Sequence, residues 1–235
     1  PETPRNFEST EVLVKYLNDY ANEMELPVKN DVTVTSATRN ADGTTIDITT
    51  DQGDYQTQNL IVASGIQNVP TTPAAADKVT SMTTADYKNP AQLPEGAVMV
   101  VGSAQSGAQI TEELLEAGRT VYLSTSKVGR FRRHIRGKDV LEWVIGAGMM
   151  KQTPADLENP AEQYATQPLA SGVGGGRTIS LQSIAAKGAN LIGRVEDFEN
   201  TTAIIKDDLR ENIDFADGFS AHVIEMLNPA IDKMA

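Results

Sequence analysis

The chain begins with a helical pattern of apolar positions and then passes into strand patterns. In "STEVLVKYLNDYANEMELPV", residues 9–28, apolar side chains recur on one helix face, and Ser9 or Thr10 offers an N-cap. Pro27 stands just past the last turn of this pattern. We therefore expect a helix that begins at Ser9 or Thr10 and ends before Pro27.

Strands are predicted next. "DVTVTSATRN" (31–40) and "TTIDITTDQG" (44–53) alternate with a period of two, and the "ADG" between them suits a hairpin turn. A third segment, "YQTQNLIVASG" (55–65), contains the unbroken apolar run Leu60–Ala63, which is typical of a strand covered on both faces. The pattern thus predicts three strands, the last of them inside a sheet.

A different order of elements follows a long connection. Residues 66–96 are rich in Pro, Thr and Asn and show little periodicity. The segment "AVMVVGSAQSGAQITEELLEAGRTVYLSTS" (97–126) then predicts a strand, a glycine turn, a helix and a second strand. Beyond it the pattern predicts loops at 127–139 and 151–178, helices at 140–150, 180–188 and 215–234, and strands at 189–200 and 201–208.

Composition limits the classes of partner. The formal net charge is −12, with acidic residues spread along the chain, which disfavours binding to an extended phosphate backbone. No apolar run approaches the roughly 20 residues of a membrane helix, so we expect neither nucleic acid nor a membrane as partner. The chain has no cysteine, which excludes a dithiol or disulfide framework within it and favours a cytoplasmic location.

The turn within residues 97–126 has the form of a dinucleotide fingerprint with one substitution. Gly102, Ala104 and Gly107 stand at positions that make the tight turn, admit the pyrophosphate and let the helix pack on the strand. The helix N-terminus would supply amide donors and a positive dipole. The pattern favours nucleotide binding, which a glycine at position 104 is expected to tighten. A plain strand-to-helix turn is the alternative.

The end of the second strand bears on which nucleotide would bind. About 20 residues after the first glycine, an Asp or Glu would hold a free ribose 2′-hydroxyl. Here Ser124, Thr125 and Ser126 stand instead, followed by a lysine and three arginines, of which Arg132 and Arg133 are the favoured contacts. Hydroxyls and cations suit a 2′-phosphate, so NADP is favoured over NAD. A solvated basic loop is the alternative.

Several segments together resemble one family. "NLIVASGIQNVPTTP" (59–73) is similar to a strand and its exit in flavoproteins with two dinucleotide-binding domains, and "DYKNPAQLPEGAVMVVGSAQSG" (86–107) to their return into the NADPH domain. "EVLVKYLNDYANEMELPV" (11–28), "RFRRHIRGKDVLEWV" (130–144) and "GGGRTISLQSIAAKGANLIGR" (174–194) resemble further segments. The family is that of FAD-dependent pyridine nucleotide-disulfide oxidoreductases, in its flavin-containing monooxygenase-like branch, and the resemblance covers nearly the whole chain.

The resemblance implies an α/β fold. It consists of a Rossmann-like NADP-binding domain, a parallel sheet with flanking helices, and a partial FAD-domain segment with a β-hairpin or meander. The implied division is residues 1–70 for the FAD-binding segment, 71–96 for an interdomain connection, 97–215 for the NADP-binding domain and 216–235 for a helix leading back toward the FAD domain.

Spacing and resemblance together assign the cofactor contacts. The NADP pyrophosphate is assigned to Gly102, Ser103, Ala104, Gln105, Ser106 and Gly107. The 2′-phosphate is assigned to Ser124, Thr125, Arg132 and Arg133, and FAD to Ala63, Ser64, Gly65 and the backbone near Val34.

Three departures from the family pattern stand out. No glycine fingerprint precedes the first helix and the segment that completes the FAD domain is missing, so the chain resembles the middle of such a flavoprotein. Ala104 replaces the middle glycine. Thr83 stands where monooxygenase relatives often carry a histidine, which weighs against oxygenation of a substrate.

Few other side chains suggest chemistry. His134 and His222 lack the spacing of a metal-binding pair, so no metal is expected, and Trp143 lies on an apolar helix face typical of a core. Glu112 and Glu113 favour the helix dipole and need no role as bases. No residue is assigned to catalysis.

The glycine-rich segment "GVGGGRT" (172–178) lacks the lysine of a phosphate-binding Walker loop. We interpret it as a flexible loop near the nicotinamide.

Three functional hypotheses follow. The first is an NADPH-dependent FAD oxidoreductase, in which hydride passes to flavin N5 and electrons then pass to oxygen or another acceptor. The second is a non-catalytic nucleotide-binding or protein-interaction module. The third, an NADP enzyme without flavin, is disfavoured because no Tyr-x-x-x-Lys pair appears. Nicotinamide and flavin nucleotides and a small-molecule substrate or acceptor are the expected partners, and a homodimer is left open.

Overall fold

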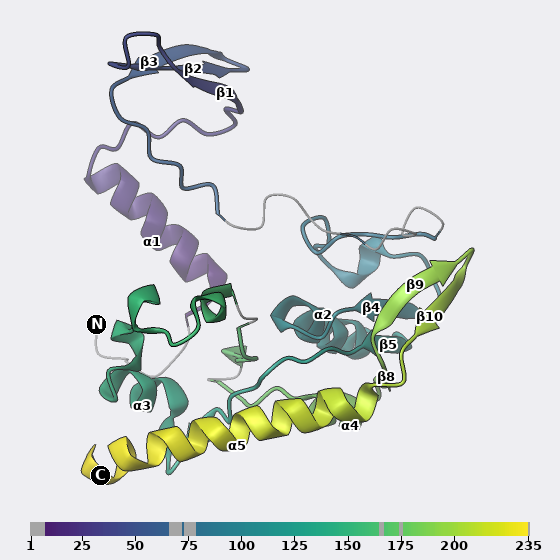
Figure 1. The fold of residues 1–235 in the computed structure, drawn as a ribbon. Coiled ribbons are helices and arrows are strands. Elements are labelled where there is room, and N and C mark those ends of the chain that lie inside the picture. The colour runs from purple at the N-terminus through teal and green to yellow at the C-terminus, as the bar shows by residue number, and fades with distance from the viewer. Residues whose placement is uncertain (1–7, 66–71, 73–78, 165–166, 174–175, 235) are drawn as a thin grey trace. The chain divides into compact units, whose positions relative to one another are not determined.

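The computed structural model describes residues 8–65, 72, 79–164, 167–173 and 176–234 (Figure 1). It contains two compact units. The N-terminal unit comprises residues 8–69, and the C-terminal unit contains residues 70–235. The boundary between the units therefore lies within the Pro-rich and Thr-rich segment that follows the first strands.

The N-terminal unit begins with α1 (Thr10–Glu23). Ser9 is its N-cap, and the Ser9 hydroxyl accepts a hydrogen bond from the Val12 amide at 3.4 Å, which confirms the predicted helix start. None of the residues of α1 is buried, so its apolar stripe is exposed. The helix is thus specified by its local sequence and its cap rather than by packing.

A three-stranded antiparallel meander completes the regular structure of this unit, in the order β1-β2-β3. Its strands are β1 (Val34–Arg39), β2 (Ile46–Thr50) and β3 (Gly53–Thr57). The predicted "ADG" turn joins β1 to β2, with Gly43 at φ +74°, a conformation that glycine adopts without strain. The prediction of a hairpin is confirmed.

The expected strand at Leu60–Ala63 is wrong for this chain. The structure has no strand there, and Ile61 and Val62 are 89% and 77% exposed. An apolar run becomes an interior strand only where neighbouring strands bind it on both sides. Among the described residues, β1, β2 and β3 pair only with one another, so no strand lies beside this run.

The C-terminal unit contains the predicted α/β core. Strands β4 (Val98–Val101), β5 (Val121–Ser124) and β8 (Asn190–Ile192) form a parallel sheet in the order β4-β5-β8. Helix α2 (Gln105–Glu116) connects β4 to β5. The strand, turn, helix and strand predicted within residues 97–126 are therefore confirmed, as is the α/β class with a parallel sheet.

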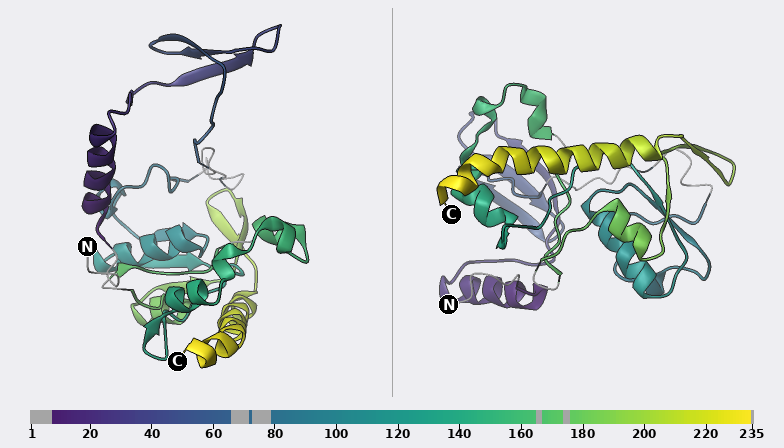
Figure 2. Two further views of the ribbon diagram at one scale, coloured as in Figure 1. Left: turned by 90° about the vertical axis from the view of Figure 1, so that its left-hand side faces the viewer. Right: turned by 90° about the horizontal axis from the view of Figure 1, so that it is seen from below.

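Two helices cover one face of this sheet. Helix α4 (Leu181–Ala186) lies beside α2, as the right-hand view in Figure 2 shows. Ala108 of α2, Leu123 of β5 and Ile184 of α4 are fully buried in the core between them. The opposite face carries the exposed side chains of Met99 and Tyr122.

A second apolar cluster lies around a hairpin that the sequence pattern did not predict. Strands β6 (His134–Ile135) and β7 (Lys138–Asp139) pair within the expected basic loop. Arg136 and Gly137 turn the chain with φ of +48° and +79°, as a two-residue hairpin requires.

Helices α3 (Val140–Gly146) and α5 (Leu209–Met234) complete this cluster. The indole N–H of Trp143 donates to the Ile135 carbonyl at 2.8 Å, and the ring is buried, so the expectation of core packing is confirmed. Helix α5 is one continuous helix from Leu209, whereas the pattern predicted a start at 215. No helix in the described part of the chain combines the length and apolarity needed to cross a bilayer.

The predicted strand at 189–200 is broken in two. Strand β8 ends at Ile192, and β9 (Val195–Glu199) pairs instead with β10 (Thr202–Ile205). A Cβ at Gly193 would lie 1.8 Å from the Lys206 carbonyl oxygen, so glycine is needed at this break. Short 3-10 helices occur at Pro90–Gln92, Met149–Lys151, Pro154–Asp156 and Pro160–Tyr164.

The packing of α2 against the turn after β4 predicts a strong asymmetry between two glycines. A Cβ at Gly107 would lie 1.9 Å from the Gly102 carbonyl oxygen, whereas a Cβ at Gly218 on α5 has no atom within 4 Å. Gly107→Ala is expected to lower the free energy of unfolding by about 3 kcal/mol through overpacking. Gly218→Ala is the control and should raise it by up to about 1 kcal/mol through helix propensity.

Urea unfolding measures both changes. Equal stability of the Gly107→Ala variant and the wild type would mean that α2 does not approach the turn so closely.

Candidate dinucleotide-binding site

The turn after β4 has the backbone geometry of a phosphate-binding turn. Gly102 has φ +102°, and its amide donates to the Ser124 carbonyl at 3.1 Å, which ties the turn to the end of β5. The close approach of Gly107 to the Gly102 carbonyl leaves no room for a side chain. The first and third positions of the fingerprint therefore carry the roles that only glycine can fill.

Ala104 occupies the middle position without strain. It is the N-cap residue of α2, with φ −73° and ψ −174°, which any residue adopts. Its methyl group packs against the core cluster that contains Ala108 and Leu123. Because that methyl group packs against the core, its position gives no reason for a glycine here to tighten nucleotide binding, and the effect stays a prediction.

The N-terminus of α2 is open to an anion. No side chain caps this helix, and Ala104 offers no acceptor to the Ser106 and Gly107 amides. Uncapped amides and the positive end of the helix dipole bind phosphate groups. Ser106 is exposed at this end.

The other two polar side chains of the turn hold neighbouring segments. The buried Ser103 hydroxyl accepts a hydrogen bond from the Ser126 amide at 3.0 Å. The Gln105 side-chain oxygen accepts one from the Ala170 amide at 3.0 Å. Ser103 and Gln105 therefore position the segments around the turn and leave its backbone amides to a ligand.

The hydroxyls expected at a 2′-phosphate have internal partners. The Ser124 hydroxyl donates to the Gly193 carbonyl at 3.2 Å and accepts from the Val195 amide at 2.9 Å. The Thr125 hydroxyl donates to the Ile192 carbonyl at 2.8 Å and accepts from the side chain of Asn212. Both residues are buried, so their contact with a phosphate stays a prediction that would require these bonds to break.

The two expected arginines differ in accessibility. Arg133 is buried, with Nε 2.6 Å from a carboxylate oxygen of Asp139. Arg132 is exposed and lines a hollow of about 370 Å³. The hollow is also lined by Arg130, Thr178, Asp217, Ser220, Ala221 and Ile224.

Arg130 is held in this hollow by an ion pair. Its guanidinium lies 2.6 Å from an Asp217 oxygen, and this hydrogen bond outweighs burial and lowers the pKa of Asp217 below its usual value. The hollow is therefore a place where Arg132 can meet an anion while Arg130 is fixed beside it.

The residues expected at FAD lie in the N-terminal unit. Val34 opens β1, and Ala63, Ser64 and Gly65 follow β3 in a segment without regular structure, all of them exposed. The described residues of this unit contain no parallel strand followed by a glycine turn and a helix. They do not by themselves form a flavin cradle.

The two histidines do not form a centre of reactivity. His134 on β6 and His222 on α5 are both exposed. Within the described ranges, no three His, Asp or Glu side chains gather in a way that could hold a metal ion.

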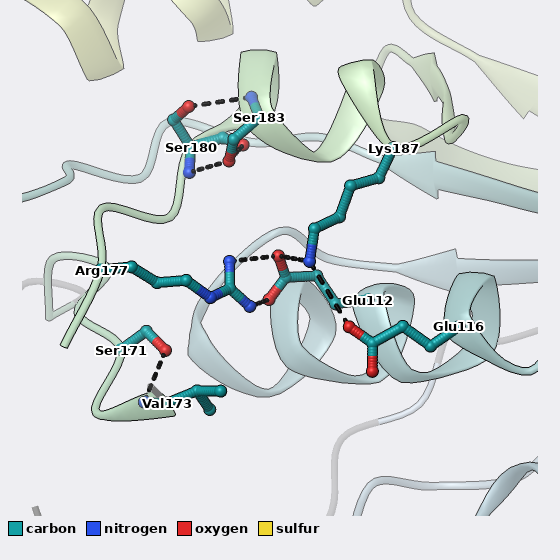
Figure 3. Close-up of polar contacts among 8 residues, drawn as sticks. All are labelled: Glu112, Glu116, Ser171, Val173, Arg177, Ser180, Ser183 and Lys187. Carbon is teal, nitrogen blue, oxygen red and sulfur yellow. Dashed lines mark hydrogen bonds and ion pairs between the residues drawn. The ribbon is translucent and has the colours of Figure 1, made fainter. Parts of the chain in front are cut away.

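Sequence reasoning missed a buried carboxylate. The Glu112 side chain on α2 is only 6% exposed and meets Arg177 and Lys187 (Figure 3). Burial alone would raise the pKa of Glu112, but the hydrogen bonds from Arg177 and Lys187 outweigh it and the pKa lies below its ordinary value. A signal was present, because Glu112 lies one turn after Ala108 on the buried face of α2.

Glu113, its neighbour, accepts a hydrogen bond from the Tyr87 hydroxyl at 3.1 Å. The two acids that the sequence presented as one pair thus have separate partners.

The parallel sheet and its glycine turn define the C-terminal unit as a Rossmann-like dinucleotide-binding fold. The family model described as pyridine nucleotide-disulphide oxidoreductase matches residues 2–147. The chain belongs to this family, which confirms the family that its segments resemble.

Curated relatives agree with this assignment. The chain is 37% identical over 152 residues to an uncharacterized oxidoreductase, CzcO-like, of Geobacillus kaustophilus, covering 63% of this chain and 43% of that protein. It is 30% identical over 167 residues to the uncharacterized oxidoreductase CzcO of Bacillus subtilis, covering 69% and 48% respectively. The chain thus spans less than half the length of these relatives.

A solved structure supports the fold. A mutant of a flavin monooxygenase from Stenotrophomonas maltophilia superposes with a TM-score of 0.58 at 16% identity. The match covers 88% of this chain and 55% of that one. At this identity the likeness concerns the fold alone.

The ion pairs of Glu112 predict a pH dependence of stability. Because its pKa is lower in the folded chain than its ordinary 4.5, the stabilisation is complete above about pH 5 and is lost as pH falls through the folded value. The difference in unfolding free energy between the wild type and Glu112→Gln should be constant above about pH 5 and change below it.

Urea unfolding across the pH range measures this difference. Glu196→Gln, which removes a carboxylate at an exposed position on β9, is the control for the loss of one surface charge. A Glu112→Gln difference that does not change below about pH 5 would contradict the ion pairs.

Proposed function

We propose that this chain provides the NADPH-binding part of a flavin-dependent oxidoreductase. The observation that carries the proposal is the uncapped N-terminus of α2 behind the turn of Gly102 and Gly107. There the pyrophosphate would accept hydrogen bonds from backbone amides of residues 103–107 and meet the positive end of the helix dipole.

The preference for NADP over NAD rests on the region after β5. No carboxylate stands at the end of that strand to bind a free 2′-hydroxyl. Arg132 is the accessible cation of the hollow beside this segment, and its guanidinium would pair with the 2′-phosphate. Arg130 and Arg133 are paired with Asp217 and Asp139, which compensate their charges, so the proposed contact rests on Arg132.

The flavin belongs to the proposal for the whole protein. The segment Ala63–Gly65 and the backbone near Val34 would contribute part of an FAD site. When bound, the nicotinamide supplies hydride to the flavin, and the residues of this chain bind and orient it. A reducing compartment such as the cytoplasm suits a chain without cysteine.

An acid placed at the N-cap tests the pyrophosphate site. Ala104→Asp would provide a carboxylate that accepts hydrogen bonds from the Ser106 and Gly107 amides, so the helix should be stabilised by about 1 kcal/mol. The same carboxylate would occupy the phosphate donors and repel the ligand. We expect wild-type chain to gain thermal stability with millimolar NADP and the Ala104→Asp variant to gain none.

Ala104→Gly is the matched control. It removes only the methyl group that packs against the core and places no carboxylate acceptor beside the Ser106 and Gly107 amides. It should bind NADP as the wild type does. Undiminished NADP binding by Ala104→Asp would exclude this helix end as the site. A wild type that gains no stability would favour the non-catalytic interaction module.

Arg132 tests the choice of nucleotide. Arg132→Gln should weaken NADP binding by about tenfold, the loss of one charge-assisted hydrogen bond, and leave NAD binding unchanged. Arg136→Gln is the control, since Arg136 lies in the β6–β7 turn and pairs with Asp232. Calorimetric titration of both nucleotides measures the ratio, and an equal loss for NADP and NAD would contradict the assignment.

A further inference from the structure

Glu112, Arg177 and Lys187, which we call the Glu112 cluster, join three parts of the C-terminal unit. The Arg177 guanidinium donates to both carboxylate oxygens of Glu112, at 2.7 and 2.6 Å. Lys187, the C-cap of α4, lies 2.9 Å from the same carboxylate and 3.5 Å from Glu116 (Figure 3). Helix α2, helix α4 and the segment around residue 177 thus meet at one buried acid.

A buried carboxylate is weak evidence for stability even when it is paired. The Glu112 side chain is 6% exposed, whereas Arg177 and Lys187 stay 33% and 35% exposed. Removing the carboxylate from water costs free energy that its attraction to the two cations only partly returns, and apolar side chains often replace such groups at no cost. Stability alone therefore does not explain why a carboxylate is buried at this place on α2. Its neighbours on the buried face of α2, Ala108 and Leu115, pack in the apolar core.

The cluster fixes the segment that runs beside the proposed nucleotide site. Arg177 donates its amide to the Ser171 carbonyl at 3.3 Å, which joins the two ends of the glycine-rich segment. The preceding residue, Ala170, bonds to Gln105, the first residue of α2. One end of the segment is therefore attached to the pyrophosphate turn.

The other end of this segment is attached to the arginines. Thr178, directly after Arg177, accepts a hydrogen bond from the Arg133 amide at 2.9 Å and lines the hollow of Arg132. Leu169 pairs with the same arginine-containing stretch through Gly129 and Phe131. Residues 169–171 and 177–178 thus connect the two places to which the proposed function assigns phosphate groups.

We propose that Glu112, Arg177 and Lys187 are positioning residues for the dinucleotide. They hold residues 169–171 and 177–178 so that the turn of α2 binds the pyrophosphate and the Arg132 segment binds the 2′-phosphate of the same NADP molecule. This inference rests on the proposed function. The two hydrogen bonds from Arg177 to Glu112 set the distance between the pyrophosphate subsite and the 2′-phosphate subsite. Lys187 ties the Glu112 carboxylate to α4.

A positioning role of Glu112 and the change in charge predict opposite effects of Glu112→Gln on NADP binding. The two acids and two cations of the group, Glu116 included, cancel in charge. Glu112→Gln therefore adds one net positive charge near the proposed phosphates, which by itself would tighten binding. If the carboxylate acts through position, the same variant weakens binding.

The test compares NADP with adenosine 2′-monophosphate, which carries the 2′-phosphate for Arg132 and no phosphate for the turn of α2. Calorimetric titration of the full chain should show that Glu112→Gln and Arg177→Gln each weaken NADP binding by about tenfold or more. Binding of adenosine 2′-monophosphate should change by less than about twofold. Arg177→Lys keeps the charge without the bidentate bond and should not restore affinity.

Glu116→Gln is the matched control. It makes the same change of charge one turn later on α2, at a side chain that is 69% exposed and lies 3.5 Å from Lys187. It should bind both ligands as the wild type does. The double variant Glu112→Gln/Arg177→Gln should lose no more affinity for NADP than either single variant, because the two residues act as one unit.

Several results would overturn the inference. Tighter NADP binding by Glu112→Gln would show that only charge matters, and equal losses for both ligands would show general damage to the fold. Amide hydrogen exchange provides a readout without nucleotide. The Ala170 and Arg133 amides should exchange faster in Glu112→Gln than in the wild type, and unchanged exchange would show that the cluster does not hold this segment.

Failure of the proposed function is distinguishable from failure of this inference. A wild-type chain that binds neither NADP nor adenosine 2′-monophosphate would overturn both the nucleotide site and the positioning role. Wild-type binding of NADP with no effect of Glu112→Gln would overturn the positioning role alone.

Discussion

The approach of helix α2 to the turn after β4 is the constraint on which the C-terminal unit depends. The Gly102 carbonyl occupies the space that a Cβ at position 107 would need, so the helix begins directly above the end of the strand. This contact places the amides at the start of α2 beside the carboxyl ends of β4 and β5, the edge at which α/β sheets bind ligands. The buried face of α2 is directed at the same time onto the core around Leu123 and Ile184.

Polar side chains then connect the loops at this edge of the sheet. Ser103 binds the segment after β5, Gln105 binds Ala170, and Ser124 and Thr125 bind the strand break after β8. Each of these hydroxyl or amide groups stands in a sequence position where a ligand contact is a natural interpretation. Apart from the Asn212 side chain, which bonds to Thr125, their partners are backbone groups, so these side chains shape the edge. The proposed ligand would then meet backbone amides and Arg132 at the surface. A dinucleotide site built in this way depends on how precisely these side chains position the loops at this edge.

Membership of the pyridine nucleotide-disulphide oxidoreductase family and the geometry of the turn both support the proposal that the C-terminal unit binds a nicotinamide nucleotide. The chain has no cysteine, so any dithiol chemistry of that family would need residues outside it. The N-terminal unit, with its exposed helix and antiparallel meander, has no parallel strand followed by a glycine turn and a helix among the described residues. The proposed nucleotide site is therefore assigned to the C-terminal unit.

The sequence by itself determined the elements whose signals are local: the Ser9 cap of α1, the hairpin after β1, and the strand, glycine turn and helix from β4 to α2. These depend on capping, on alternation and on φ angles that few residues adopt. Tertiary structure alone decided the rest. The apolar run at Leu60–Ala63 is not a strand, since no strand among the described residues pairs with it. Whether Ser124, Arg133 or Glu112 faces a ligand or a partner depends on which distant groups folding brings within hydrogen-bonding distance, and residue spacing along a chain does not encode that distance.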